Sequence, residues 1–432
     1  TVEGPLSKSK DVGSFMISGR RSYFDLFFPL SEQTRDVSAY FFDINAKINY
    51  KIGEKDRIYL SAYNGRDKLG VAGLIGLGWG NTTTTLRWNH IFTDKLFMNV
   101  SAIYSRYNYN FDLDIARNLN FRRLNYIDDY VLKADFNYYI SPKSSLKFGA
   151  SGTYHIFEPG KRVPITSESL ITEAALPRKK ALDNYAYISH KIDVNARLNV
   201  EYGLRISQFS NIGGRSIIYE NNTPNSIVNG AIRPNAQLGF NNYRANEIFN
   251  TYYGIEPRLG TAYQINSSSS LKGSYNRMYQ YMNLIQNTTA SIGQEFWIPV
   301  DNYIKPQYAD QVALGYFRNF FENQIEASVE VYYKSMYNTP ELIDNADIGF
   351  NEAIESQLVL GRGRAYGSEF LIKKPKGKTT GWLAYTLAKS ERRADNINNG
   401  DWYSFRFDRT HYLTLVVTHD FNERFTLAGN FI

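Results

Sequence analysis

The stretch Tyr-Phe-Phe-Asp-Ile-Asn-Ala-Lys-Ile-Asn-Tyr at residues 40–50 decides the fold class. Its two faces as a strand have opposite character: one carries Tyr40, Phe42, Ile44, Ala46, Ile48 and Tyr50, and the other carries Asp43, Asn45, Lys47 and Asn49. A strand separates these sets completely, whereas a helix would mix them. Because a charge in the middle of a strand needs water, the polar face must be wet, and the apolar face must contact protein or lipid.

The same alternation returns at residues 132–140, 198–206 and 325–333. Short polar turns join the predicted strands in pairs, near residues 53–55, 93–95, 141–143, 193–196, 266–269, 321–323, 375–377 and 422–423. Between these pairs we expect long connections, at residues 65–79, 108–129, 157–182, 209–251, 279–308, 337–362 and 391–409. Alternation of short turns with long loops is typical of an all-β, transmembrane antiparallel β-barrel, with its turns on the periplasmic side and its loops outside the cell.

The composition agrees with a β-barrel and argues against a helical membrane protein and a nucleic-acid-binding protein. The 432 residues have a mean hydropathy of −0.41, and we find no run of about 18 apolar residues that could form a transmembrane helix. The chain contains 34 Tyr, several of them at predicted strand ends, where the membrane interface favours this side chain. The net charge of +7 is scattered rather than gathered in a patch, so we do not expect nucleic-acid binding.

The strand count predicts an incomplete barrel. The hairpins and one preceding strand at residues 14–20 give about 17 strands, whereas single-chain bacterial barrels normally have an even number. Residues 1–5 read as the tail of an earlier strand that turns at residues 7–10. We therefore expect residues 1–432 to be one partial outer-membrane β-barrel that lacks its terminal strands.

Several short motifs follow one another along nearly the whole chain. They are Phe-Met-Ile-Ser-Gly-Arg-Arg-Ser-Tyr at 15–23, Glu-Pro-Arg-Leu at 256–259, Leu-Lys-Gly-Ser-Tyr-Asn-Arg at 271–277, Lys-Pro-Gln-Tyr-Ala-Asp-Gln at 305–311, Tyr-Gly-Ser-Glu-Phe at 366–370 and Phe-Asp-Arg-Thr-His at 407–411. In this order and spacing they resemble the barrel region of TonB-dependent receptors of the Bacteroidetes type.

The resemblance implies a 22-stranded barrel in the outer membrane of a Gram-negative bacterium, with a plug domain that we do not recognise in residues 1–432. It implies active import of a scarce ligand, of the siderophore, vitamin, glycan or peptide class, with energy from TonB. A passive porin, or an adhesive or structural barrel that binds a partner through its loops, remains an alternative. The expected partners are outer-membrane lipid and lipopolysaccharide, the TonB complex through the plug region, the ligand and, as an option, a surface lipoprotein, but no nucleic acid.

Catalysis, cofactors and metals have little support in the sequence. Without cysteine there is no thiolate site, and the five histidines, His90, His155, His190, His411 and His419, lack the spacing of a helical zinc pair. The glycine-rich run at residues 73–80 precedes a strand-like segment rather than a helix, so we interpret it as a loop tip and not as a phosphate cradle. Residues 344–347 lack the spacing of a calcium loop. We therefore predict no enzyme, no cofactor and no catalytic or metal-binding residue.

Aromatic, amide and arginine side chains in the long loops are the candidate ligand contacts. One loop offers Tyr279, Gln280, Tyr281, Gln294 and Trp297, and a later loop offers Trp402, Arg406 and Arg409. Arg362 and Arg364, on either side of Gly363, could line the lumen or bind a lipid phosphate. The alternative for all of them is that they pack loops together or belong to the outer aromatic girdle.

Overall fold

One large antiparallel sheet makes up most of the molecule. A computed structural model describes residues 1–7, 12–116, 118–285 and 296–432. Their main sheet has 20 strands, and two further pairs of strands and five short 3-10 helices lie in the connections. None of the described helices has the length and apolar character needed to cross a membrane.

Most strands of the main sheet are long. They are β1 (Val2–Pro5), β2 (Gly13–Arg21), β3 (Val37–Lys51), β4 (Asp56–Val71), β5 (Ile75–Thr93), β6 (Leu96–Ala116), β7 (Leu119–Ser141), β8 (Ser144–Pro164), β9 (Ala174–Ala175), β10 (Lys179–Asp193), β11 (Leu198–Tyr219), β14 (Gln237–Asn266), β15 (Ser269–Gln280), β18 (Gln307–Phe320), β19 (Ile325–Leu342), β20 (Leu358–Lys374), β21 (Thr379–Arg393), β22 (Tyr403–Ser404), β23 (His411–Asn422) and β24 (Phe425–Phe431). Apart from the short β1, β9 and β22 they number 17, as the sequence predicted, and residues 1–5, where the sequence predicted part of a strand, contain β1.

The smaller elements lie between these strands. The two extra pairs are β12 (Asn225–Val228) with β13 (Ala231–Pro234), and β16 (Met282–Ile285) with β17 (Phe296–Pro299). The 3-10 helices are η1 (Phe24–Leu26), η2 (Phe28–Leu30), η3 (Glu220–Asn222), η4 (Ile354–Gln357) and η5 (Asn398–Gly400).

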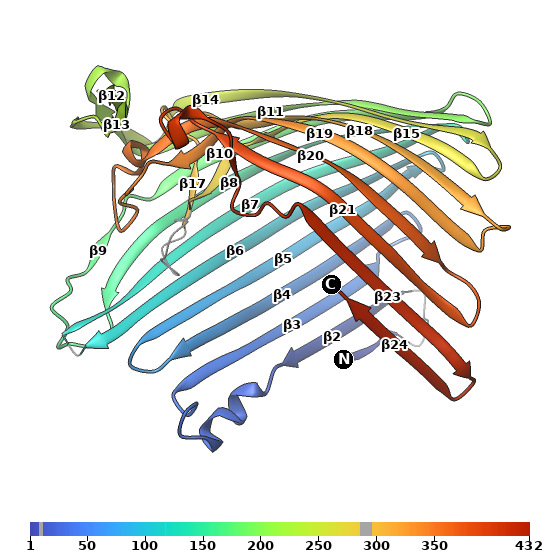
Figure 1. Ribbon diagram of the computed structural model, residues 1–432, viewed down its shortest axis with the longest axis horizontal. Helices are drawn as coiled ribbons and strands as arrows, with labels where there is room; N and C mark the ends of the chain where they lie inside the picture. The colour runs from blue at the N-terminus through green and yellow to red at the C-terminus, as the bar shows by residue number, and fades with distance from the viewer. Residues whose placement is uncertain (8–11, 117, 286–295) are drawn as a thin grey trace.

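Each long strand pairs with the next long strand along the chain, so the sheet is an up-and-down meander. The two short strands β9 and β22 add to β8 and β21. The sheet curls around a central space but is not closed, and β1 and β24 form its two edges (Figure 1).

All eight expected tight turns are present, and they lie together at one end of the sheet (Figure 1). Phe321, Glu322 and Asn323 turn the chain with positive φ angles between 52° and 64°. The opposite end carries β9, β12–β13, β16–β17 and all the 3-10 helices. We call this the loop end.

Two of the expected long connections are strands instead. Residues 65–79 belong mostly to β4 and β5, which are joined by a short turn with Gly73 at φ 70°, and residues 108–129 belong almost entirely to β6 and β7. The glycine-rich run is therefore a turn and the first six residues of β5, not a flexible loop tip. Five glycines interrupt the alternation in residues 65–79, and in residues 108–115 the alternation continues with its apolar residues on the inner face, the reverse of the membrane-spanning pattern.

The two faces of the sheet follow the predicted alternation. Ile44, Leu132 and Ile206, on the predicted lipid face, are 51%, 63% and 51% exposed. The other face carries polar pairs that cross between strands, such as the Tyr187 hydroxyl donating to Asp135 at 2.7 Å. We call the apolar face the outer face and the polar one the inner face.

Candidate functional site

A hairpin at the loop end folds over the inner face of the sheet. It consists of β16 and β17, and we call it the inner hairpin; its tip, residues 286–295, lies outside the described residues. Although it arises between β15 and β18, it reaches back to contact β8 and β10. The backbone N–H of Val300 closes its base by donating to Tyr281 at 2.8 Å, and Asn211 of β11 donates to Val300 at 2.8 Å.

Apolar side chains hold the inner hairpin on the sheet. Phe209 of β11 is fully buried and stacks on Tyr281, with ring centroids 5.1 Å apart. The cluster around them consists of Phe157, Ala181, Phe209, Tyr281, Ile285, Phe296, Ile298, Val300, Ile304, Ile348, Ile354 and Leu358. Because it joins four sheet strands to two connections, this cluster fixes the hairpin as part of the folded domain.

A pocket of about 400 Å³ lies between the inner hairpin and the inner face of β5–β8. We call it the luminal pocket. The sheet contributes Asn81, Ser105, Tyr107, Tyr109, Asn125, Tyr126, Ile127, Asp129 and Glu158, and the hairpin contributes Met282, Leu284, Phe296 and Trp297. Its volume lies within the range of small-molecule sites in proteins.

The lining of the luminal pocket combines flat apolar surfaces with hydrogen-bonding groups. Aromatic rings come from both walls, and two Asn side chains lie among them. The Asp129 carboxylate pairs with the buried Nδ1 of His155 at 2.7 Å, while Glu158 accepts a hydrogen bond from Arg178 at 2.8 Å. None of the described residues that line the pocket is Lys or Arg. The pocket can therefore stack against a ligand and bond to its polar groups, and its lining offers no Lys or Arg side chain to an anion.

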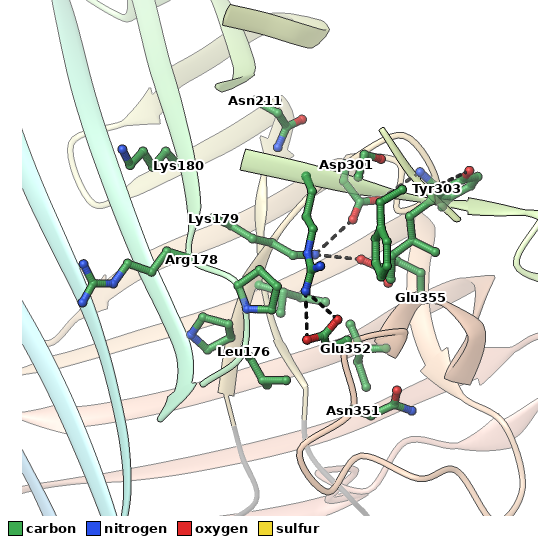
Figure 2. A pocket seen from close by; sticks show the side chains of 18 of the residues that line it. Leu176, Arg178, Lys179, Lys180, Asn211, Asp301, Tyr303, Asn351, Glu352 and Glu355 are labelled. Atoms are coloured by element: carbon green, nitrogen blue, oxygen red, sulfur yellow. Dashed lines mark hydrogen bonds and ion pairs between the residues drawn. The ribbon is translucent and has the colours of Figure 1, made fainter. Parts of the chain in front are cut away.

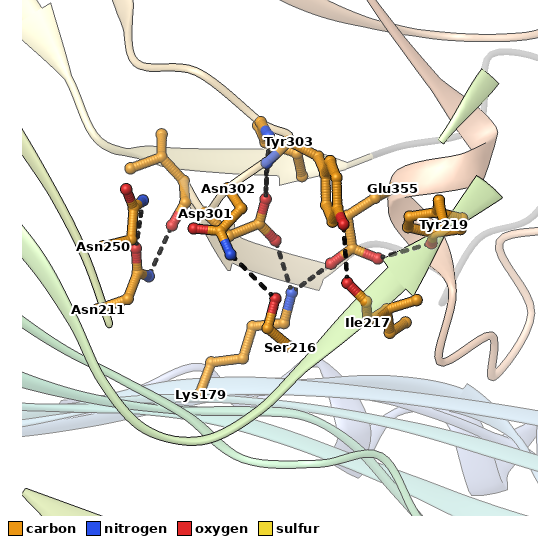
Figure 3. A network of polar contacts seen from close by, with 12 residues as sticks. Lys179, Asn211, Ser216, Ile217, Tyr219, Asn250, Asp301, Asn302, Tyr303 and Glu355 are labelled. Atoms are coloured by element: carbon orange, nitrogen blue, oxygen red, sulfur yellow. Dashed lines mark hydrogen bonds and ion pairs between the residues drawn. The ribbon is translucent and has the colours of Figure 1, made fainter. Parts of the chain in front are cut away.

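A buried ion cluster ties the connections at the loop end to the sheet (Figure 3). Lys179, the first residue of β10, lies with its Nζ 2.7 Å from Oε1 of Glu355 in η4 and 3.3 Å from Oδ2 of Asp301, just beyond β17. The backbone N–H groups of Tyr303 and Ile304 both donate to Asp301 at 2.9 Å. One cation thus holds the inner hairpin and the β19–β20 connection in place.

The two carboxyl groups of this cluster differ in the direction of their pKa shifts. Burial raises the pKa of Glu355 to about 7, against the opposing effect of Lys179, and the negative charge of Asp301 adds to the rise. Burial also acts to raise the pKa of Asp301, but Lys179 and the two backbone N–H groups outweigh it and lower that pKa below its usual value. Near neutral pH the cluster therefore consists of an ionised Lys179–Asp301 pair beside a Glu355 that is partly protonated.

A second, enclosed cavity next to the ion cluster is too small for a ligand (Figure 2). Its volume is about 50 Å³, well below the several hundred Å³ of a small-molecule site. At its edge the Nη2 of Arg215 in β11 donates to both carboxylate oxygens of Glu352, at 3.0 Å to Oε1 and 2.8 Å to Oε2. This pair links the same two parts of the molecule as the ion cluster, so we interpret the cavity as a packing defect between docked connections.

The candidate ligand contacts of the first loop lie in different surroundings in the structure. Trp297 lines the luminal pocket, but Tyr281 is buried and pairs its hydroxyl with Ser207 at 2.8 Å. Tyr279 stacks on Tyr308 with ring centroids 5.4 Å apart, and Gln280 donates to the backbone of Met282. Gln294 lies outside the described residues. Of this group, Trp297 alone stays a candidate ligand contact among the residues that the structure describes.

The arginine and tryptophan candidates lie away from the luminal pocket. By register, Arg362 and Arg364 share the outer face with Tyr366. Arg364 bonds to Glu391 at 2.7 Å, and its guanidinium lies 4.2 Å from the ring centre of Trp402. Arg406 packs over Phe407, and Arg409 is exposed on the same connection. These residues therefore fit loop packing and the outer surface rather than the lumen.

The sequence alone missed most of the luminal pocket. Tyr107, Tyr109 and Asn125 fall in residues 108–129 or at its border, which we expected to be a loop, and Asn81 follows the glycine-rich run. One signal was available: Ser105, Tyr107 and Tyr109 alternate with Arg106, Asn108 and Asn110, which continues the period of β6. The partners of Lys179 lie 122 and 176 residues away, beyond the reach of any local pattern.

Histidines and acidic loops form no metal centre in the described part of the chain. No group of three or more His, Asp or Glu side chains there is placed to hold an ion. His411 pairs with Tyr385 at 2.8 Å, and Asp347 accepts the N–H of Gly349 within its own loop.

Three solved structures with the same fold are described as receptors or as a transporter. The ferric-catecholate import receptor Fiu of E. coli K12 matches at 10% identity with a TM-score of 0.66, over 98% of this chain and 66% of Fiu. The ferripyoverdine receptor of Pseudomonas aeruginosa matches at 14% identity with a TM-score of 0.67, over 99% of this chain and 58% of the receptor. The copper transporter OprC matches at 12% identity with a TM-score of 0.65, over 95% of this chain and 62% of OprC.

These similarities define the fold and leave the ligand open. The chain spans less than two thirds of the length of each of these three structures. No curated protein matches the sequence. The family model described as "TonB dependent receptor-like, beta-barrel" matches residues 17–431. It covers the family as a whole, so the Bacteroidetes type stays a prediction. The chain belongs to the TonB-dependent receptor β-barrel family and is an outer-membrane protein.

Proposed function

We propose that this chain forms the wall and the ligand vestibule of an active transporter, which imports a scarce ligand across the outer membrane with energy from TonB. The observation that carries the proposal is the inner hairpin. It projects over the inner face, narrows the space inside the sheet and forms an aromatic and amide pocket. A passive pore has no need of such a pocket, whereas a receptor that captures a dilute ligand requires one.

The lining of the luminal pocket supports a neutral or cationic ligand with at least one flat face. Trp297 and Tyr107 offer stacking surfaces from opposite walls, and Asn81 and Asn125 offer amide groups. Glycans and peptides have this chemistry, as do some vitamins and siderophores. A polyanionic chelate fits poorly, because the lining contains no Lys or Arg to pair with its charges.

The remaining partners follow from family membership. Coupling to the TonB complex would pass through a plug region that is not part of these residues, and a surface lipoprotein could cover the loop end. We assign no enzymatic activity to the chain.

Uptake by cells tests the proposal directly. A deletion strain that carries Trp297→Ala in the full-length protein should accumulate the ligand at least tenfold more slowly at limiting concentration, with normal protein levels in the outer membrane. Trp88→Ala is the matched control, because Trp88 lies on the outer face near a tight turn. Normal growth of the deletion strain on every candidate nutrient would argue for an adhesive or structural barrel, and a large steady single-channel conductance would argue for a porin.

A further inference from the structure

The outer face of β6 indicates where the hydrophobic core of the membrane begins and ends. Its outward residues from the tight turn are apolar at Leu96, Met98, Val100 and Ala102, reach Tyr104, and then become polar at Arg106. Ten residues span about 33 Å along a strand, or about 25 Å along the membrane normal at a tilt near 40°. That matches the height of the apolar band of an outer-membrane barrel. Arg106 therefore lies at the level of the lipid head groups on the loop side.

A groove of about 310 Å³ opens on the outer face at and above this level. Arg66 of β4 is paired across β5 with Gly80, which is in turn paired with Asn108 of β6. One step further out, Gly78 lies between Lys68 and Asn110. Gly78 and Gly80 give β5 no side chain here, so the side chains of β4 and β6 on either side of it border the groove.

The groove carries more cations than anions. Arg66, Arg106, Lys161 and Arg178 line it, together with Asn108 and Asn110. Three of the cations also pair with carboxylates: Arg106 with Asp128, Lys161 with Glu173 and Arg178 with Glu158. The fourth, Arg66, is exposed and makes no ion pair among the described residues. The formal charge of these groups is therefore +1, with the excess on Arg66.

The paired arginines keep donors free for a ligand. Arg106 uses Nε and Nη2 on Asp128, at 2.6 Å and 2.5 Å, and retains its other N–H groups. Tyr126 lies beneath the guanidinium groups of both Arg106 and Arg178, at 4.7 Å and 5.9 Å from its ring centre. This stacking holds the guanidinium planes in place. Fixed arginines with spare donors are suited to phosphate, which accepts two parallel hydrogen bonds.

We propose that this outer groove binds the phosphate of a phosphorylated glycolipid in the outer leaflet, such as lipopolysaccharide. The phosphate would lie against Arg66 and Arg106, and the amides of Asn108 and Asn110 would bond to the adjoining sugar. The groove lies across the strands from the luminal pocket, and Asn125, Tyr126 and Glu158 border both. A bound glycolipid would thus brace the wall of the pocket from outside. The proposal rests on the outer-membrane location and not on the transport function.

Binding of purified lipids to the full-length protein in detergent, followed by native mass spectrometry, tests the assignment. The probes are diphosphoryl lipid A, lipid A with its phosphates removed, and inorganic phosphate. We expect diphosphoryl lipid A to bind at least tenfold more tightly than the dephosphorylated form. Arg66→Gln should weaken its binding about tenfold, the scale of one charged hydrogen-bonded contact. Arg66 makes no structural ion pair, so the variant should fold.

A second variant blocks the groove and leaves every charge in place. A Cβ at Gly78 would meet only the Asp67 carbonyl oxygen at 3.7 Å, which is an ordinary contact. The variant Gly78→Phe should therefore fold, and its side chain should occupy the groove. It should weaken lipid A binding as much as Arg66→Gln does. Arg233→Gln, on the distant β13, is the control and should change nothing. Unchanged binding by both groove variants would overturn the proposal. Inorganic phosphate that binds as tightly as lipid A would overturn the lipid assignment.

Discussion

Replacing Lys179 with Met should release the inner hairpin from the sheet. Lys179 is the one cation within ion-pair distance of Asp301 and Glu355 among the described residues. Both carboxylates are less than a tenth exposed. Met has a similar length and no charge, so the variant removes the ion pair while keeping most of the packing.

The expected cost follows from the burial of the remaining charge. Breaking a buried ion pair by removing one partner typically costs about 3–5 kcal/mol. The lower figure applies here, because two backbone N–H groups still stabilise Asp301 and because Glu355 takes up a proton near pH 7. About 3 kcal/mol corresponds to roughly a hundredfold increase in the population of the open hairpin.

Hydrogen exchange of the full-length protein measures that population. Amides at residues 296–304 and 354–358 should exchange about a hundredfold faster in Lys179→Met, while those of β2–β5 stay unchanged. Lys180→Met is the matched control, since Lys180 is adjacent but lies on the other face of β10. Adding Glu355→Gln should recover part of the protection. Exchange within about threefold of the wild type in Lys179→Met would refute the role of the ion cluster.

Three further predictions concern pH, the strand faces and the pocket. Because the pKa of Glu355 is raised to about 7, its contribution to docking of the inner hairpin is complete below the ordinary carboxyl pKa of about 4.5 and is lost as the pH rises through 7. The pKa of Asp301 is lowered, so this residue has the opposite effect, at more acidic pH. Between about pH 5 and 8, exchange rates corrected for intrinsic pH effects should therefore rise with pH, and Glu355→Gln should abolish that rise. Ala46→Arg on the outer face should cost about 2–4 kcal/mol in folding titrations with lipid vesicles, whereas Asn45→Arg on the inner face should be tolerated; equal costs would contradict the face assignment. Tyr107→Ala, opposite Trp297, should raise the ligand Kd by about tenfold, and an unchanged Kd would remove Tyr107 from the pocket.

The membrane-spanning half of the fold was predictable because lipid and water impose opposite demands on alternate residues. Residues 40–50 give the register of β3 directly, and the tight turns give the strand number. The same signal fails at residues 65–79 and 108–129. At residues 65–79 five glycines interrupt the alternation, and at residues 108–115 the apolar residues fall on the inner face and the polar ones on the outer face, the reverse of the pattern in the membrane.

The site was less predictable because it depends on contacts between distant parts of the chain. Trp297 was chosen because aromatic and amide side chains occur together in its loop, and residues 296–300 read Phe-Trp-Ile-Pro-Val. Nothing local indicates that it packs on β8, β10 and β11. Tyr281 shows the opposite case, since an aromatic loop residue chosen as a ligand contact anchors the loop instead.

The proton gradient tests the central claim most directly. Cells that express the full-length protein should accumulate the ligand from limiting concentrations, and collapse of the inner-membrane proton gradient should abolish that accumulation while ligand still binds at the cell surface. Trp297→Ala should reduce both binding and accumulation. Accumulation that persists without the gradient and rises in proportion to external concentration would contradict active transport, and would identify the barrel as a passive pore.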